Sequence, residues 1–235
     1  MLRFQNIQIK NNTKPIFGFH HICLLNNGAD IFKEQLETIV SSGLYNATTQ
    51  IFCSIVGAGS DVFELPDKYN VVYQSEDMSS GERKILEYMY VSSNIHIGSY
   101  YYIHTKGVSR FNHPFYQNIK DWRLLMEHFL IVHWKNRHNE LLNCDVVGIN
   151  YMTYPLPHFS GNFWWTKSDY ISRSPVTFNY KDYLEPEMYI CSSRPVKILC
   201  VYNTNLGHTH FSTPFPKSLY SHYSGVLNSK TIVLT

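Results

Sequence analysis

The feature of this sequence that most constrains its fold is an alternation of short apolar segments with longer segments of helical periodicity. The short segments are rich in β-branched and aromatic residues, a composition typical of buried strands. They cover residues 16–25, 50–56, 71–73, 100–104, 144–149, 159–165 and 197–202. Apolar residues recur at helical spacing in residues 29–40, 81–92 and 118–143. This order predicts an α/β fold with a mostly parallel central sheet flanked by helices.

The length of the chain suits one compact domain. Of its 235 residues, 44% are hydrophobic and only 16% are charged, which is sufficient for a sizeable core. We expect a single domain over residues 1–206 and an extension over residues 207–235. Because the extension contains Phe211, Phe215 and Tyr223, we expect it to pack on the domain.

The composition argues against several classes of protein. A net charge of +2 gives no sign of nucleic-acid binding. The five cysteines are widely spaced and include no Cys-x-x-Cys pair, so we expect reduced thiols rather than a zinc ribbon or a disulfide framework. The chain shows neither an apolar leader nor a run of roughly 18 apolar residues that could span a membrane, so we expect a cytoplasmic protein. Aromatic residues, at 15%, favour stacking on sugars or bases, with core and interface packing as the alternative.

One predicted strand, 100–103, delivers a group of reactive side chains at its end. It leads directly into His104, Thr105, Lys106 and Gly107. Open α/β sheets bind ligands at the carboxyl ends of their strands. Lys106 supplies a cation, His104 a hydrogen-bond donor or proton carrier, and Gly107 permits a tight turn beside a bound group. A hairpin corner with a surface lysine is the alternative.

A second polar group follows a proline-marked loop. It consists of His158, Ser160, Gly161 and Asn162, followed by Trp164 and Trp165. His158 and Asn162 could bond sugar hydroxyl groups, and a tryptophan face could stack on a sugar ring. Because neighbouring strand residues point to opposite faces, we expect at most one tryptophan, Trp164, to line a cleft. An aromatic-rich structural hairpin is the alternative.

Two acids, Glu185 and Glu187, flank Pro186 at the start of a predicted short helix. A carboxylate held there could accept a proton from a hydroxyl nucleophile. The alternative is a pair of ordinary first-turn acids that interact favourably with the helix dipole, and the local pattern alone favours it.

Two further pairs are candidate ligand-binding residues. Asp121 could cap the long helix, and Arg123 could pair with it or reach a phosphate. His20 and His21 lie in the first strand, near the crevice where a doubly wound sheet holds a nucleotide. A buried, hydrogen-bonded histidine pair is the plainer interpretation.

The sequence contains no HExxH, EF-hand, P-loop or GxGxxG motif. It also contains no Asp-x-Asp pair that would hold Mg²⁺ or Mn²⁺ against a diphosphate. We therefore predict no metal ligand. A zinc site built from His20, His104, His208 and His210 is conceivable, so a metal-dependent hydrolase is one hypothesis.

Four motifs occur in the order YIHTKG, DWR, HFSGNFWW and EPEMYI. With them the chain resembles a glycosyltransferase-like family of large DNA viruses, bacteria and algae, whose members carry an HTKG strand end and a GNFWW segment. That family is similar to nucleotide-sugar transferases of the GT-A type, so the resemblance implies a GT-A-like, Rossmann-like domain. It spans Phe17 to Ile190, and Gly81 with Glu82 also fits its pattern.

The resemblance implies transfer of a sugar from a nucleotide-diphosphate sugar to a hydroxyl of a glycan or another acceptor. Without an Asp-x-Asp pair, Lys106 and His104, helped by an arginine, would neutralise the departing diphosphate. Mn²⁺ or Mg²⁺ stays open as a cofactor. Glu185 or Glu187 would deprotonate the acceptor, which would attack with inversion.

We therefore predict two groups of site residues. The catalytic residues are Glu185, Glu187, His104 and Lys106. The substrate-binding residues are His20, His21, Glu82, Thr105, Gly107, Arg110, Asp121, Arg123, His158, Ser160, Gly161, Asn162 and Trp164. The alternative function is a non-catalytic protein that binds a nucleotide sugar or a carbohydrate on the same scaffold.

Overall fold

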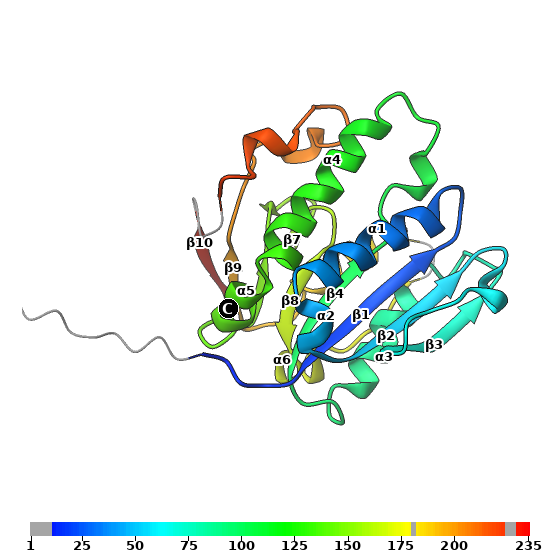
Figure 1. Cartoon of the computed structure of the whole chain (residues 1–235). Helices are drawn as coiled ribbons and strands as arrows, with labels where there is room; N and C mark the ends of the chain where they lie inside the picture. Colours follow the sequence, from blue (N-terminus) through cyan, green and yellow to red (C-terminus); the bar gives the residue numbers. More distant parts are fainter. Residues whose placement is uncertain (1–10, 180–181, 224–228) are drawn as a thin grey trace, which may run out of the picture.

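The computed structural model describes residues 11–179, 182–223 and 229–235. Figure 1 shows one central sheet with helices packed on both of its faces. The α/β class and the mostly parallel sheet that the sequence predicts are confirmed.

Within the described residues, the central sheet has eight strands in the order β10-β9-β5-β8-β4-β1-β2-β3. Their bounds are β1 Ile16–Cys23, β2 Thr48–Val56, β3 Tyr69–Ser75, β4 Ser99–His104, β5 Val146–Gly148, β8 Trp164–Lys167, β9 Val196–Cys200 and β10 Lys230–Leu234. Strands β1 to β4 run parallel, and β9 runs parallel to β5. Strand β8 is antiparallel to its neighbours β4 and β5, and β10 is antiparallel to β9. The carboxyl ends of β1, β2, β4, β5 and β9 therefore lie along one edge of the sheet.

Strands β1 and β4 are neighbours at the centre of the sheet although they are not consecutive in the chain. Their register places His21 opposite His104, and on the other side of β1 it places Cys23 opposite Val56 of β2. The chain leaves β1 toward one side of the sheet and returns to the other side as β4. Such a switch in strand order leaves a crevice at the carboxyl ends of the two strands, where open α/β sheets bind ligands.

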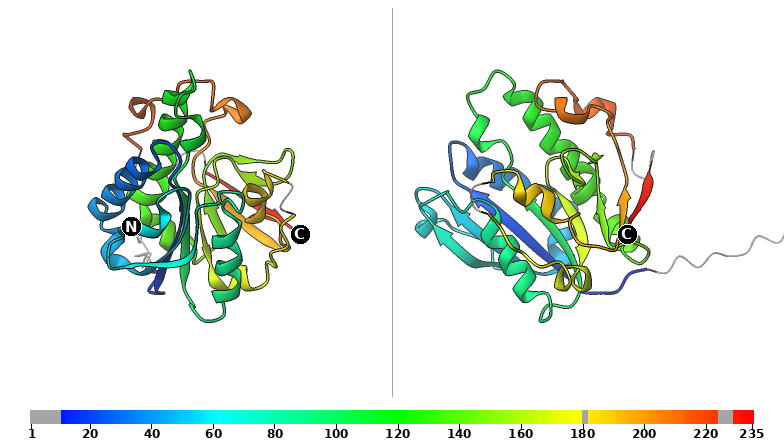
Figure 2. Two further views of the ribbon diagram at one scale, coloured as in Figure 1. Left: turned by 90° about the vertical axis from the view of Figure 1, so that its right-hand side faces the viewer. Right: turned by 180° about the vertical axis from the view of Figure 1, so that it is seen from behind.

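The helices form a layer on each face of the sheet (Figure 1 and Figure 2). The first face is covered by α1 (Gly28–Ser41), α2 (Leu44–Ala47), α4 (Tyr116–Glu127) and α5 (Trp134–Glu140). The second face is covered by α3 (Arg83–Ser92), α6 (Ser168–Ser172) and α7 (Glu185–Tyr189). Alternate residues of β4 supply both cores, because Tyr101 is buried under the first layer and Tyr102 under the second.

The fold also contains shorter elements. A separate two-stranded sheet pairs β6 (Tyr151–Met152) with β7 (His158–Phe159). In the described part of the chain, 3₁₀ turns cover Ser60–Val62, Val108–Arg110, Gly207–Thr209 and Lys217–Leu219.

The prediction of one continuous helix over residues 118–143 is wrong, because the helix is interrupted. A π-helical turn, His128–Val132, separates α4 from α5. Residues 125–131 are all buried, so no single helical stripe could place them in the core. The buried Arg137 donates to the carbonyl oxygen of Phe129 at 3.2 Å, which stabilises the interrupted turn.

The described residues after position 206 pack on the fold at several points, and His210 among them stacks on Trp122. Tyr220 is fully buried and stacks on Phe215, with 6.1 Å between ring centroids. Strand β10 extends the central sheet beyond β9. Phe211 and Leu219, in contrast, are about half exposed.

All five cysteines are free, and all except Cys23 are buried. Burial raises the pKa of the Cys53 and Cys144 thiols to about 12, so both are protonated at neutral pH. Within the described ranges, no helix combines the length and the apolar character that crossing a membrane requires.

Candidate functional site

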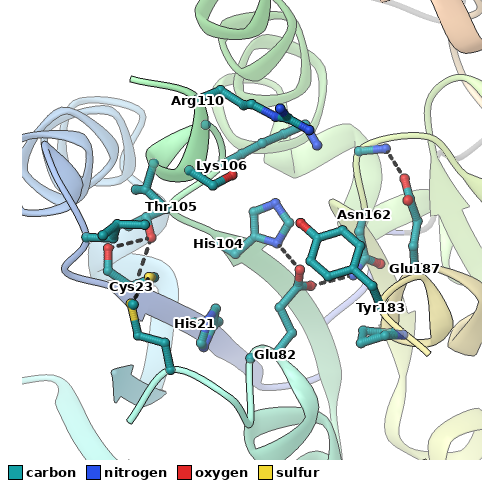
Figure 3. Close-up of a pocket in the computed structure, with 18 of the residues that line it drawn as sticks. His21, Cys23, Glu82, His104, Thr105, Lys106, Arg110, Asn162, Tyr183 and Glu187 are labelled. Carbon is teal, nitrogen blue, oxygen red and sulfur yellow. Dashed lines mark hydrogen bonds and ion pairs between the residues drawn. The ribbon is translucent and has the colours of Figure 1, made fainter. Parts of the chain in front are cut away.

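A pocket of about 440 Å³ opens at the carboxyl ends of β1, β2 and β4, where the strand order switches. The turn before β8 and the loop leading into α7 form its opposite wall. Ten of the residues predicted from the sequence line it, namely His21, Glu82, His104, Thr105, Lys106, Gly107, Arg110, Gly161, Asn162 and Glu187. Figure 3 shows Lys106 and Arg110 on one side of His104 and Glu187 on another.

The Glu82 carboxylate, which immediately precedes α3, is held by three side chains. The Tyr102 hydroxyl and the Asn162 amide each donate to Oε2 at 2.6 Å. The His104 Nδ1 atom lies 3.0 Å from Oε1. Burial by itself raises the pKa of Glu82, but His104, His21 and the Tyr102 hydroxyl together hold it at about 2. The Glu82 side chain is therefore ionised at neutral pH, and its three partners fix the orientation of the carboxylate.

The end of β4 is clamped to the end of β1. The Thr105 hydroxyl accepts the backbone N–H of Cys23 at 2.9 Å, and the Thr105 N–H donates to the carbonyl oxygen of His21 at 3.1 Å. Gly107 then turns the chain with a φ of 104°, a conformation that favours glycine. These contacts keep His104 and Lys106 at the carboxyl end of β4, beside β1.

Among the described residues, three cationic side chains line the pocket, namely Arg83, Lys106 and Arg110. The Lys106 Nζ atom lies 4.0 Å from the ring centroid of Trp122 in α4. Burial lowers the pKa of Lys106, and the charges of Glu187 and Glu82 oppose that effect. Arg110 is exposed, and its guanidinium has no ion-pair partner among the residues that the structure describes.

Glu187 supplies the second carboxylate of the pocket. Glu185 and Glu187 both lie in the first turn of α7, as predicted, but Glu185 does not line the pocket. The backbone N–H of Gly161 donates to Oε1 of Glu187 at 2.6 Å. Gly161 has a φ of 98°, and a Cβ atom there would lie 2.5 Å from the Met126 sulfur. Only glycine allows the turn to come this close to α4 while its N–H holds Glu187.

Several other predicted residues do not line the pocket. Three of them, His158, Ser160 and Asp121, make hydrogen bonds elsewhere. His158 is buried in β7, where Nδ1 lies 2.7 Å from the carbonyl oxygen of Leu156. Ser160 is buried, and its N–H donates to the carbonyl oxygen of Asn150. Asp121 does not cap α4 but lies within it and accepts a hydrogen bond from Gln117.

Trp164 does not line the pocket either. The prediction that it lines a cleft is therefore wrong. It is fully buried and stacks on Tyr102, with 4.9 Å between ring centroids. Its indole N–H donates to Oδ1 of Asn162 at 2.8 Å, which directs the Asn162 amide N–H toward Glu82. Trp165 is equally buried on the opposite face, against Tyr101. Trp164 thus contributes to the pocket indirectly, by orienting Asn162 toward Glu82.

Arg123 does not reach the pocket either. Its guanidinium is buried and bonds Glu127 at 2.9 Å and Glu34 at 2.5 Å, rather than Asp121 or a phosphate. This ion-pair cluster joins α4 to α1. The predicted role of Arg123 in phosphate binding therefore finds no geometric basis.

The histidines of the hydrolase hypothesis do not converge. His20 bonds Gln35 at 3.0 Å, whereas His208 contacts the ring of Tyr154 and His210 stacks on Trp122. Among the described residues, no three His, Cys, Asp or Glu side chains are arranged to hold a metal ion.

We expect the buried His20 to make the free energy of unfolding depend on pH. Its burial lowers its pKa to about 3, far below the ordinary value of 6.5. Between these values the unfolded chain binds one more proton than the folded protein does, so stability falls as the pH drops from 6.5 toward 3. His20→Asn is expected to reduce that slope by up to about 1.4 kcal/mol per pH unit in urea titrations. The exposed His208→Asn is the control, and an equal reduction in it would contradict the assignment.

The pocket residues that were not predicted from the sequence include three aromatic ones, Trp122, Tyr183 and Phe211. Trp122 carried the signal of an apolar helix position and belongs to the DWR motif, but it was not predicted to bind a ligand. Phe211 was identified only as an apolar residue of the extension. Tyr183, at the mouth of the pocket, is 85% exposed and carried no sequence signal. Figure 3 shows its ring beside the Glu82 and Asn162 side chains.

The pocket lies within a recognised family of sequences. The family model described as "Domain of unknown function (DUF8361)" matches residues 19–212. The chain belongs to this family. No curated protein and no solved structure matches the chain. The range shared with the DUF8361 family contains every residue that lines the pocket, from His21 to Phe211, and leaves out β10.

Proposed function

We propose that this protein is a glycosyltransferase that moves a sugar from a nucleotide-diphosphate sugar to a hydroxyl acceptor. The observation that carries this proposal is a single pocket in which two cations, Lys106 and Arg110, face two carboxylates, Glu82 and Glu187. Departure of a diphosphate requires cations at the leaving group, and activation of a hydroxyl requires a base. The pocket supplies both.

The position of the pocket supports a nucleotide as part of the donor. It lies where the order of parallel strands switches between β1 and β4, the place where doubly wound sheets bind nucleotides. We therefore assign the fold to the GT-A-like, Rossmann-like type that the sequence motifs suggest.

The diphosphate is assigned to the Lys106 side of the pocket. Lys106 is held over Trp122 and is partly desolvated, so its charge acts in a medium of low dielectric constant. Arg110 is available for bidentate binding of phosphate oxygens. Both charges would stabilise the negative charge that develops on the leaving oxygen.

Glu187 is assigned as the base. The pKa of Glu82, about 2, makes it a weak proton acceptor, and both of its oxygens already have protein partners. One oxygen of Glu187 accepts the Gly161 N–H, and the carboxylate lines the pocket. The acceptor O–H bond breaks as its proton passes to Glu187, and the oxygen bonds the anomeric carbon. The bond from that carbon to the phosphate oxygen breaks, and its electron pair leaves with the diphosphate.

A divalent cation does not fit the donor set of this pocket. Among the described lining residues, the carboxylates are Glu82 and Glu187. Glu82 is already bonded by Tyr102 and Asn162, and Glu187 accepts the Gly161 N–H. The steps above therefore use protein side chains alone.

Lys106→Met tests the assignment of the diphosphate. We expect purified protein to show a rise in melting temperature with one class of UDP-, GDP- or dTDP-sugar, in EDTA as well as in Mn²⁺. Loss of the charge-assisted bonds to phosphate should raise the donor Kd by about 10- to 100-fold in Lys106→Met. Release of nucleoside diphosphate in the presence of an acceptor would then separate a transferase from a binding protein.

Lys135→Met is the matched control, because Lys135 also lies over a tryptophan, Trp134, but lines a different cavity. It should bind the donor like the wild type. A shift that requires Mn²⁺, or an equal loss in the two variants, would contradict the assigned role of Lys106. No shift with any nucleotide sugar would contradict the proposed function itself.

A further inference from the structure

A second pocket, of about 560 Å³, opens at the carboxyl ends of β5 and β9, beside the start of β10. In Figure 1, β9 and β10 lie at the side of the sheet away from β3, and β1 and β4 lie between them. The two pockets share no lining residue. We infer that this second pocket binds a neutral saccharide.

Asn150, in the loop after β5, presents a buried hydrogen-bond donor at this pocket. Its side chain is oriented by Thr204, whose backbone N–H and hydroxyl donate to Oδ1 at 2.9 and 3.1 Å. Because the Thr204 N–H can only donate, the oxygen and nitrogen of the Asn150 amide cannot be exchanged.

The Nδ2 group of Asn150 has no hydrogen-bond partner among the described residues, although Asn150 is only 3% exposed. A buried N–H without an acceptor is unfavourable, and native structures satisfy nearly all such groups. Asn150 has a φ of 52°, a left-handed conformation that asparagine tolerates better than most residues. A ligand oxygen would satisfy the free donor.

The other lining residues favour hydroxyl groups over ions. Asn203 and Asn205 add amides that can both donate and accept, which matches the dual character of a sugar hydroxyl. Tyr151 and Tyr154 add flat rings for the C–H face of a sugar, and Tyr154 is 74% exposed. Lys230 is the single charged side chain among the described lining residues, whereas the first pocket holds cations and carboxylates.

Saturation-transfer difference NMR on the full chain tests this inference. The probes are glucose, galactose, mannose, xylose, N-acetylglucosamine and lactose, with glucuronate and glucose 1-phosphate as charged comparisons. We expect saturation to pass from the protein to at least one neutral sugar, which would show that this sugar binds. Tyr154→Ala removes an exposed ring, and Asn205→Gly removes an amide while tolerating its φ of 61°. Each should raise the apparent Kd by at least about tenfold.

Asn150→Asp keeps the Oδ1 acceptor for Thr204 but replaces the free N–H donor by a carboxylate oxygen, which accepts and carries negative charge when ionised, so it should also raise the apparent Kd by at least about tenfold. Tyr183→Ala, at the mouth of the first pocket, is the matched control and should bind the sugar like the wild type. Circular dichroism and melting temperature verify that each variant is folded.

Three results would overturn the inference. One is that no neutral sugar gives a saturation-transfer signal. Another is that the charged sugars give a stronger signal than the neutral ones. The third is binding that Tyr183→Ala abolishes and Tyr154→Ala leaves intact. Binding of neutral sugars here and of nucleotide sugars in the first pocket are separate measurements, so failure of one leaves the other standing.

Discussion

Glu187→Gln is expected to lower the rate of sugar transfer by about 10²- to 10⁴-fold, the usual contribution of a general base. This loss corresponds to about 2.7–5.4 kcal/mol of transition-state stabilisation. The glutamine oxygen can still accept the Gly161 N–H, so the turn at residues 160–162 should be unchanged. The nucleotide-sugar Kd should therefore stay near the wild-type value. The measurement is release of nucleoside diphosphate at saturating donor, with the Kd taken from thermal shifts.

Glu185→Gln is the matched control for this prediction. Glu185 lies two residues away in the same helical turn but does not line the pocket. Its replacement should leave the transfer rate near that of the wild type. Equal losses in the two variants would indicate an effect of the helix rather than of the base. If Glu187→Gln kept full activity, Glu187 would not be the base.

The local features of this fold could be predicted because they depend on neighbouring residues. The runs of β-branched and aromatic residues in β1, β2 and β4 are short and apolar, and the periodicity of α1 and α3 is regular. Parallel strands end at the same edge of a sheet, so His21 and His104 could each be expected at the edge that binds ligands. The structure adds that they lie opposite each other in the register of β1 and β4.

The long-range arrangement could not be predicted, because the sequence order of strands does not determine their spatial order. Strand β8 lies between β4 and β5, and this insertion brings Asn162 against Glu82, 80 residues earlier in the chain. The same turn brings Gly161 to Glu187. No local pattern in the sequence encodes either contact.

The predictions for Trp164 and Arg123 failed for a common reason. Both side chains have a polar group as well as a large apolar body, so they can be buried where a partner is available. Trp164 finds Asn162 as that partner, and Arg123 finds Glu127. From the sequence alone, a polar group directed at a ligand and one directed at an internal partner look the same.

Arg123→Met is expected to destabilise the fold by about 3–5 kcal/mol, the usual effect of removing one partner of a buried ion pair. Both partners are buried, since the side chains of Arg123 and Glu127 are 1% and 3% exposed. Without the guanidinium, Glu127 would be left as an uncompensated charge in the core. Urea unfolding at neutral pH measures the loss. Lys120→Met is the matched control, because Lys120 pairs with the same Glu34 at the surface, 3.2 Å away. It should change stability by at most about 1 kcal/mol.

The pH dependence of the Arg123→Met defect distinguishes an orphaned charge from lost packing. Burial already raises the pKa of Glu127 above its ordinary value of 4.5, and Arg123 is the main group that opposes this effect. In the variant, the folded protein therefore retains the Glu127 proton at pH values where the unfolded chain has released it. Since the folded state then binds more protons, the stability of the variant falls relative to the wild type as the pH rises above 4.5. The defect should be smaller at pH 5 than at pH 8, and adding Glu127→Leu should remove most of it. A defect that is independent of pH and survives in the double variant would show that Arg123 acts through packing of its aliphatic stem.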